Sequence, residues 1–248
     1  MGGVHRSSLV GTSKYLVGNN DYTEPMAERK RNYGDSCGIA RALDLVGERW
    51  ALLVVRELVL GAKRFTDLRA GLPGVSADVL SQRLRELESG GVLVRRTLPP
   101  PAAARVYELT AWGRELEPAL HALGRWGSQT ALPAEPPPLS ADAAVVALQT
   151  TFDPARAGDI DAAFQLRLGD RHFRLRIGDR RLRARQGTDD GALATIATDA
   201  GTLAAVLWHG RSLDEAIASG SLSIEGDRPA AQRLLGSFSG GPAGLDTA

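Results

Sequence analysis

Hydrophobic residues in the first half of the chain recur every three or four positions, the spacing of helices with one buried face. This spacing predicts two scaffold helices within residues 39–60 and two further helices at residues 65–72 and 76–89. The last two are separated by Leu-Pro-Gly at residues 72–74, because proline cannot continue a helix and glycine accepts the backbone angles of a turn. Ser76 suits the N-cap of the final helix. The pattern predicts a helix-turn-helix.

Two short segments, residues 92–96 and 105–109, follow this helix pair and flank the stretch TLPPPAAA. They predict a wing, a hairpin with arginines at its base. A helix in a major groove reads base edges with its polar face, and basic residues beside it contact phosphates. The candidate DNA-binding residues are Ser76, Ala77, Asp78, Ser81, Gln82, Arg83 and Arg85 on the helix, with Arg64, Arg95, Arg96 and Arg105 around it. A helix pair that never contacts nucleic acid is the alternative at this point.

An apolar stripe with two tryptophans follows the wing and predicts one helix over residues 111–129. The positions of this stripe that matter for association are Trp112, Leu116, Leu120, Leu123 and Trp126. They can complete the core of the winged domain, or they can form the interface of a homodimer, where large aromatic residues anchor binding. We expect the interface, because the earlier helices already provide a core and a reader of palindromic sites needs a second copy.

The hydrophobic period changes after residues 131–139, a stretch with four prolines that predicts a stiff linker. From residue 164 to residue 185 apolar and polar residues alternate between Gly-Asp turns, which predicts an antiparallel meander, and helical patterns follow it. The expected fold class is α+β. The expected domains are a winged helix-turn-helix domain at residues 28–130 and a two-layer α+β domain at residues 140–240 with an antiparallel sheet covered by helices, between flexible tails at residues 1–27 and 241–248.

The two faces of this predicted sheet differ in chemistry. Helices over the apolar face can leave a cavity for an apolar ligand, or the same side chains can fill the core. The candidate ligand-binding residues are Phe164, Leu166, Phe173, Leu175, Ile177, Leu203, Leu207 and Trp208. The other face is either a solvated surface or a site for phosphates or an acidic partner. Its basic residues are Arg174, Arg176, Arg181, Arg183 and Arg185.

Composition adds few constraints. Hydrophobic residues make up 43% of the 248 residues and the formal net charge is +1, which neither supports nor excludes DNA binding. The four histidines are scattered, and the chain has no P-loop, no strand-linked GxGxxG and no GxSxG motif. We therefore expect no enzymatic activity, no metal and no cofactor. No stretch approaches membrane-spanning length and the first residues lack a signal-peptide core, so we expect a cytoplasmic protein.

Cys37 is the single cysteine, which excludes an intramolecular disulfide and a cysteine-based zinc cluster. It stands at the beginning of the first predicted helix, where exposed amides and the helix dipole favour the thiolate form of a cysteine. A redox-sensitive thiol is one interpretation of this position. A buried and inert cysteine is the other.

Three motifs occur in order along the first domain, CGIARALDLVGERW at residues 37–50, RFTDL at residues 64–68 and LPGVSADVLSQRL at residues 72–84. They resemble the HxlR-type family of bacterial transcriptional regulators, and the likeness extends to residue 130. The resemblance implies a dimeric winged helix-turn-helix protein whose recognition helix reads the major groove. Some members of that family sense oxidants or electrophiles through a cysteine at the position of Cys37, and this chain keeps the residue. The wing tip departs from the family because it lacks charged residues, so Arg95, Arg96 and Arg105 must carry any contact that the wing makes with DNA.

Two further motifs, ATIATD at residues 194–199 and GSLSIEGD at residues 220–227, resemble a sterol-carrier-protein type domain over residues 140–240. That resemblance implies a cavity for an apolar ligand. The combined expectation is a homodimeric, sequence-specific regulator that binds a double-stranded DNA operator and responds to a small apolar effector. The alternatives are a winged scaffold repurposed as a carrier of apolar metabolites or as a biosynthetic enzyme, and a regulator controlled through the thiol of Cys37.

Overall fold

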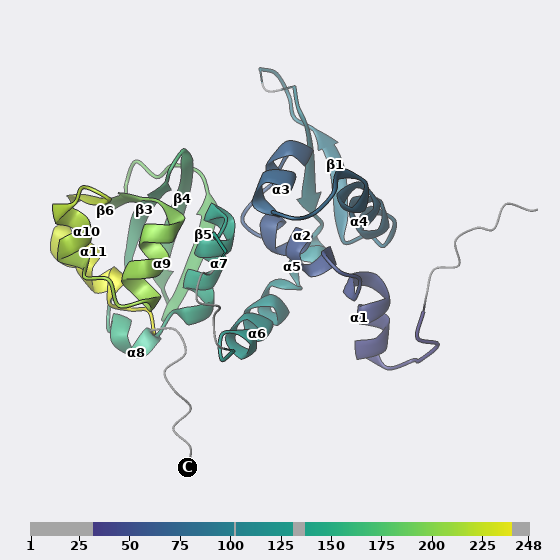
Figure 1. Ribbon diagram of the computed structural model, residues 1–248, viewed down its shortest axis with the longest axis horizontal. Coiled ribbons are helices and arrows are strands. Elements are labelled where there is room, and N and C mark those ends of the chain that lie inside the picture. Colours follow the sequence, from purple (N-terminus) through teal and green to yellow (C-terminus); the bar gives the residue numbers. More distant parts are fainter. Residues whose placement is uncertain (1–31, 102, 131–136, 240–248) are drawn as a thin grey trace, which may run out of the picture.

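The computed structural model describes residues 32–101, 103–130 and 137–239 (Figure 1). The predicted tails at residues 1–27 and 241–248 lie outside the described residues, as do residues 131–136 of the predicted linker. In Figure 1 the winged domain (purple to teal) lies beside the second domain (green to yellow). The winged domain and the second domain pack against each other through α7.

The first domain has the element order of a winged helix-turn-helix. Its elements are α1 (Gly38–Val46), α2 (Ala51–Leu58), α3 (Phe65–Gly71), α4 (Ala77–Ser89), β1 (Leu93–Thr97) and β2 (Arg105–Leu109). Gly74, between α3 and α4, has a φ of 89°, a conformation that glycine adopts without a steric penalty. Ser76 caps α4, because its Oγ accepts a hydrogen bond from the Val79 amide at 3.2 Å. β1 and β2 pair antiparallel, so the predicted helix-turn-helix and its wing are confirmed.

The segment after the wing forms two helices, so the prediction of one continuous helix is wrong. α5 (Ala111–Arg114) and α6 (Glu117–Gly127) are separated by two residues. Pro118 lies in the first turn of α6 and has no amide hydrogen, so it cannot donate to the carbonyl of Arg114 four residues earlier. The chain therefore starts a new helix at this point.

The second domain is a five-stranded sheet with helices packed on it. Its strands are β3 (Ala162–Leu168), β4 (Arg171–Gly178), β5 (Arg181–Gln186), β6 (Ala194–Thr198) and β7 (Leu222–Gly226). Its helices are α7 (Ala141–Thr151), α8 (Pro154–Ala157), α9 (Ala200–Trp208), α10 (Leu213–Ala218) and α11 (Arg228–Leu235). The α+β class is confirmed.

The strand order of this sheet is β5-β4-β3-β6-β7. β3, β4 and β5 form the predicted antiparallel meander, but β6 pairs parallel with β3. The cause is the segment at residues 187–193, which carries the chain from the edge strand β5 across to the free side of β3. The sheet is therefore mixed, whereas the sequence predicts an antiparallel one.

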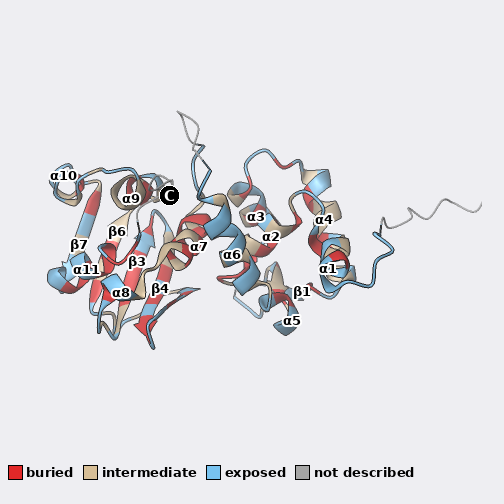
Figure 2. Ribbon diagram, turned by 90° about the horizontal axis from the view of Figure 1, so that it is seen from below, coloured by how far each residue is buried: buried red, intermediate tan, exposed pale blue. Residues whose placement is uncertain are grey.

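Helix α7 lies between the two domains, and no helical period in the sequence predicts it. Its residues are buried on nearly every side, with Ala144 and Val145 both at 0% exposure (Figure 2). The helix packs on α2, α3 and α6 of the winged domain and on β5 and α9 of its own domain. A helix that is apolar all round belongs in the interior, and it lacks the amphipathic pattern by which a sequence identifies a helix.

A buried group of charges joins the two domains beside α7. Lys63, between α2 and α3, is 2% exposed, and its Nζ lies 2.6 Å from Glu57 Oε2 and 2.7 Å from Asp142 Oδ2. Arg171 lies 3.2 Å from the same oxygen of Asp142, and Ser140 Oγ donates to Glu57 Oε1 at 2.8 Å. Burial raises the pKa of Asp142 above its ordinary value, while Lys63 opposes that shift. The charges compensate one another where an unpaired charge is costly.

The backbone of Lys63 also connects this group to the wing. Its amide donates to the carbonyl of Tyr107 in β2 at 3.0 Å, and the amide of Tyr107 donates back at 2.8 Å. At the end of α3, a Cβ on Gly71 would overlap Glu57 Oε2, so glycine allows this helix to approach the buried carboxylate. The helix-turn-helix, the wing and the second domain therefore meet at one small cluster of residues.

Candidate nucleic-acid interface

The exposed face of α4 carries polar residues that the sequence assigns to base recognition. Each of these residues lies three or four positions from two of the others, so they share one face of the helix. They are Asp78, Ser81, Gln82 and Arg85. The leucines on the opposite face are fully buried in the core, and they are Leu80, Leu84 and Leu87. α4 can therefore present a polar surface to a major groove, which is wide enough to admit a helix.

Gln82 is held by two neighbours on its own helix. Its Nε2 donates to Glu86 Oε1 at 2.7 Å, and its Oε1 accepts from Arg85 Nη2 at 2.5 Å. The amide thus has its donor and its acceptor engaged in the absence of DNA. A bidentate contact with an adenine edge uses the same two groups, so base binding exchanges these hydrogen bonds for new ones.

Arg83 is turned away from this face. Its side chain is 14% exposed, and its Nη1 lies 2.5 Å from Glu86 Oε2 and 3.6 Å from Glu48 Oε2. One residue along a helix corresponds to a rotation of about 100°, which directs Arg83 toward the connection between α1 and α2. The structure therefore does not support the DNA contact that the sequence predicts for Arg83, and it shows instead a residue that fastens α4 to its scaffold.

The remaining predicted contacts around α4 differ in exposure. The hydroxyl of Ser76 is used as the helix cap, and Ala77 is half-buried. Arg64 is exposed at the start of α3, where its amide donates to Asp67 Oδ2 at 3.2 Å. Val79, also on α4, is 40% exposed. An exposed valine among polar residues can contact a thymine methyl group, a role that the apolar period of α4 conceals.

The wing is a hairpin that projects from the domain (Figure 1), and its strands β1 and β2 carry the arginines that the sequence assigns to the wing base. Arg95, Arg96 and Arg105 are all exposed. Arg96 pairs with one oxygen of Glu108 at 2.7 Å, and Arg114 pairs with the other oxygen at 2.6 Å. Within the described part of the chain, Arg95 and Arg105 make no ion pair. The wing base is therefore positively charged, and Glu108 limits that charge at Arg96.

Apolar side chains are exposed on α5 and α6. Trp126 is 71% exposed, and about half of Trp112 and of Leu123 is exposed. Leu116 and Leu120, predicted on the same stripe, are instead partly buried against the core of their own chain. Two further exposed residues lie on α1, where the sequence predicts scaffold packing, and they are Ile39 and Leu43. The exposed apolar surface therefore differs in part from the predicted one.

The predicted ligand-binding residues lie in the core of the second domain. Those that are at most 1% exposed are Phe164, Leu166, Phe173, Leu175, Ile177 and Leu203. Leu207 and Trp208 are partly buried and pack against the same cluster. Interiors are close-packed, and these side chains occupy the space between the sheet and its helices. The structure therefore favours the filled core over an apolar cavity at these positions.

The opposite face of the sheet is exposed and basic. In the register of β4 and β5, Arg174 lies opposite Arg185, and Arg176 lies opposite Arg183. Arg176 pairs with Asp161, and both are exposed. Like charges that face each other across two strands repel, so this part of the surface favours the approach of an anion.

Cys37 is exposed at the N-cap position of α1, which rules out the buried and inert cysteine. Its backbone amide donates to Asp35 Oδ1 at 2.8 Å. The reactivity of its thiol stays a prediction. In the described ranges, no three His, Cys, Asp or Glu side chains are grouped so that they could hold a metal ion. No helix there has both the length and the apolar character that a membrane crossing requires.

Comparisons with known proteins separate the two domains. The HxlR-like helix-turn-helix family matches residues 45–135, a range that begins after Cys37. The HTH-type transcriptional regulator YvaP of Bacillus subtilis is 38% identical over 89 residues, which are 36% of this chain and 82% of that protein. An HTH-type transcriptional regulator of Synechocystis sp. is 41% identical over 95 residues, which are 38% of this chain and 70% of the relative.

The alkyl sulfatase C-terminal family matches residues 137–241, which overturns the sterol-carrier-protein assignment. The motifs behind that assignment end in helix caps, Asp199 for α9 and Asp227 for α11. They therefore reflect strand-to-helix connections, which many folds share. The solved sec-alkylsulfatase Pisa1 from Pseudomonas sp. is 21% identical with a TM-score of 0.35, over 37% of this chain and 15% of that chain.

The order of elements in the first domain, the buried leucines of α4 and the match to YvaP over most of the length of that regulator all agree. The chain therefore belongs to the HxlR-like helix-turn-helix family through its first domain, and the domain that follows matches the alkyl sulfatase C-terminal family over residues 137–241.

Proposed function

We propose that this protein is a sequence-specific DNA-binding transcriptional regulator. The observation that carries the proposal is the polar face of α4 next to the exposed arginines of the wing base. A recognition helix with basic residues beside it supplies both base readout and phosphate contacts. The two related proteins described above are named as transcriptional regulators, which supports the same role for this chain.

The regulator acts as a homodimer in this proposal. Trp112 and Trp126 expose large aromatic surfaces on α5 and α6, and Ile39 is exposed on α1. Exposed aromatic residues are typical anchors of interfaces, and dimers read two half-sites that mirror the symmetry of the protein. Their exposure supports an interface with a second copy.

The second domain is the regulatory part in this proposal, and it binds a small effector. The ion pair of Lys63 with Asp142 and the burial of α7 support coupling between the two domains. The predicted apolar ligand residues pack as a core, so the effector site in this proposal lies outside that core. A carrier or an enzyme is the competing function, and turnover or transport of a bound compound without DNA affinity would favour it.

The proposal is tested by titrating the full-length protein against DNA from its own promoter region and against random DNA of equal length. The salt concentration is held fixed, because phosphate contacts make affinity depend strongly on salt. We expect the promoter DNA to bind at least about a thousandfold more tightly than random DNA. Equal affinity for the two DNAs would overturn the proposal.

A thiol switch is a second candidate mode of regulation, favoured by the exposure of Cys37. Because it is the single cysteine, a disulfide can form only with another molecule, such as a second copy or a small thiol. Mass spectrometry and DNA titration after mild peroxide treatment test it, with Cys37→Ser as the control. An unmodified thiol together with unchanged DNA affinity would exclude this mode.

A further inference from the structure

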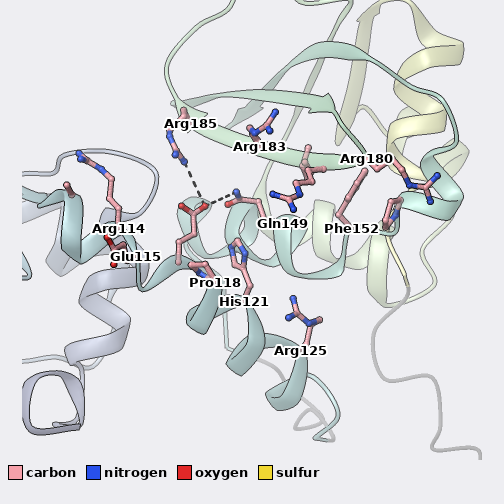
Figure 3. Close-up of a pocket in the computed structure, with 15 residues that line it drawn as sticks. Arg114, Glu115, Pro118, His121, Arg125, Gln149, Phe152, Arg180, Arg183 and Arg185 are labelled. Carbon is pink, nitrogen blue, oxygen red and sulfur yellow. Dashed lines mark hydrogen bonds and ion pairs between the residues drawn. The ribbon is translucent and has the colours of Figure 1, made fainter. Parts of the chain in front are cut away.

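A cleft of about 860 Å³ lies between the winged domain and the second domain. Helix α6 forms one wall and contributes His121 and Arg125 (Figure 3). The edge strand β5 and the end of α7 form the other wall, with Arg183 and Arg185 from β5 and Gln149 from α7. The cleft is large enough for a small organic molecule. It exists only because the two domains are packed together.

The lining of this cleft is strongly basic. Six arginines line it, against two glutamates, and the arginines are Arg114, Arg125, Arg180, Arg181, Arg183 and Arg185. Of these, Arg125, Arg180 and Arg181 have no ion pair with any carboxylate in the described part of the chain. A cleft lined mainly by one sign of charge concentrates its electric field and attracts the opposite charge. The lining therefore favours an anion.

Apolar and unsatisfied polar atoms complete the lining. Phe152 and Leu182 contribute apolar surface between the arginines. His121 Nε2 and Gln149 Oε1 are buried without a hydrogen-bond partner, although Gln149 Nε2 donates to Glu117 at 3.2 Å. Buried polar atoms normally have partners, so the wall of the cleft holds two polar atoms whose hydrogen-bonding capacity is unused. The lining thus fits a molecule with both a polar head and an apolar part.

The turn between β4 and β5 also supports an anion site in the cleft. Asp179 and Arg180 both have positive φ, 52° and 58°, as in the tight hairpin turn that favours glycine at its second position. Arg180 therefore adopts a left-handed conformation that disfavours residues with a Cβ. Residues held in such conformations cluster at functional sites. Here the turn places a guanidinium at the cleft.

We propose that this cleft binds a small amphiphilic anion, a molecule with a sulfate, phosphate or carboxylate head and a short apolar tail, as the effector of the regulator. The role of the anion as an effector rests on the proposed transcriptional function. The binding of the anion to the cleft does not. The arginines contact the anionic head, because guanidinium groups form charge-assisted hydrogen bonds with oxyanions. Phe152 and Leu182 contact the tail.

The position of Arg114 gives the anion a route to the wing. Arg114 lines the cleft and shares the carboxylate of Glu108 with Arg96 at the wing base. An anion that attracts Arg114 leaves Glu108 to Arg96 alone, which reduces the free positive charge at the wing. Exposed ion pairs are individually weak, so this route adjusts DNA affinity rather than abolishing it.

Calorimetric titration of the full-length protein with hexyl sulfate, far below its micelle concentration, tests the binding. Hexanol and inorganic sulfate are the matched probes for tail alone and head alone, while hexyl phosphate and hexanoate distinguish the head groups. We expect one hexyl sulfate per chain, bound at least about tenfold more tightly than hexanol or inorganic sulfate. Binding of hexanol as tight as that of hexyl sulfate would overturn the proposal.

Two variants locate the site. Arg180→Gly removes a guanidinium and relieves the left-handed backbone, so the protein stays folded while affinity for hexyl sulfate falls by about tenfold. Arg125→Gln, on the opposite wall, gives a similar loss. The matched control is Arg167→Gln, an exposed arginine of β3 that does not line the cleft, and it leaves affinity unchanged. Equal affinity in all three variants and the wild type would place the anion elsewhere and overturn the proposal.

DNA titration with and without hexyl sulfate then separates this inference from the proposed function. Allosteric coupling of ordinary size changes DNA affinity by about fivefold or more, and Arg114→Gln reduces that change. If hexyl sulfate binds in the cleft but the protein binds no DNA with or without it, the anion site is supported and the transcriptional function is overturned. If the protein prefers its promoter DNA but does not bind hexyl sulfate, the transcriptional function is supported and the anion site is overturned. Binding of both ligands without mutual effect would overturn the role as effector.

Discussion

Lys63 and Asp142 form a buried ion pair, with 2.7 Å between Nζ and Oδ2, that joins the winged domain to the second domain. Lys63 contacts Glu57 at 2.6 Å as well, so one ammonium group serves two interior carboxylates. Its backbone is hydrogen-bonded to the wing strand β2. Lys63 therefore links the DNA-binding surface to the second domain, in addition to the packing of α7 on α2, α3 and α6.

Replacing Lys63 by methionine keeps most of the side-chain length and removes the charge. The two carboxylates then lose their shared cation, so we expect Lys63→Met to lower the free energy of unfolding by about 3–5 kcal/mol. Guanidinium denaturation measures this loss. The control is Arg176→Gln, which breaks the exposed pair with Asp161 and costs less than about 1 kcal/mol. Similar losses of unfolding free energy in the two variants would contradict a larger contribution from the buried Lys63 pair.

The recognition helix is tested by two neighbouring arginines. Arg85 is exposed on the polar face of α4, so Arg85→Ala is expected to reduce discrimination between promoter and random DNA by about 1–3 kcal/mol. Arg83→Gln is the matched control, because its ion pairs with Glu48 and Glu86 direct it inward. It lowers stability and leaves discrimination intact. Fluorescence anisotropy with promoter and random DNA measures the discrimination. A loss of discrimination in Arg83→Gln as large as in Arg85→Ala would contradict the assignment of Arg85 to base recognition.

The wing base is tested through Glu108. Glu108→Gln removes the carboxylate that Arg96 shares with Arg114, so we expect higher affinity for promoter and random DNA alike. Arg95→Gln, in contrast, removes a free cation, lowers both affinities and reduces the salt slope by about 1. Glu225→Gln, an exposed glutamate of β7 in the second domain, is the control for net charge alone. Equal gains in Glu108→Gln and Glu225→Gln would rule out a local effect at the wing.

Association between copies is tested at Trp126. Its exposed indole anchors the proposed interface, so Trp126→Ser is expected to weaken dimerisation by about 2 kcal/mol or more. Sedimentation analysis across a range of protein concentrations measures the dissociation constant. Leu193→Ser, which removes an apolar side chain exposed on the second domain, serves as the control. A dimer unaffected by Trp126→Ser would show that its interface lies elsewhere.

His121 makes anion binding depend on pH. Burial lowers the pKa of His121 below its ordinary value of 6.5, while Glu117 opposes this shift and Arg125 adds to it. The other groups lining the cleft near it are Gln149 from α7 and Arg183 and Arg185 from β5. A bound sulfate ester favours the protonated ring and raises that pKa, so affinity for hexyl sulfate increases as pH falls through the pKa of the complex.

Calorimetry with hexyl sulfate over the pH range of histidine titration measures this dependence, because a sulfate ester does not titrate there. His121→Gln keeps a hydrogen-bonding side chain and abolishes the increase at low pH. An unchanged pH profile in His121→Gln would assign the titration to another group.

Much of the fold follows from local patterns. The breaking of the helical period at residues 72–74, the cap at Ser76 and the alternation along β3 to β5 each involve neighbours in sequence, and each predicts an element that the structure contains. Helix α7 has no such signal, because burial from two sides removes its polar face. The parallel pairing of β6 with β3 depends on a chain crossing that no local pattern encodes.

The candidate sites, like the fold, have parts that the sequence predicts and parts that depend on the tertiary structure. The sequence by itself determined the helix-turn-helix, the basic wing base and the alternation that separates an apolar from an arginine-rich sheet face, because these depend on residue spacing alone. Only the tertiary structure decided that Arg83 pairs with Glu48, that the sheet residues fill a core and that α6 and β5 enclose a cleft. Each of those outcomes depends on which distant side chains share space and charge, and that is settled when the two domains pack around Lys63 and α7.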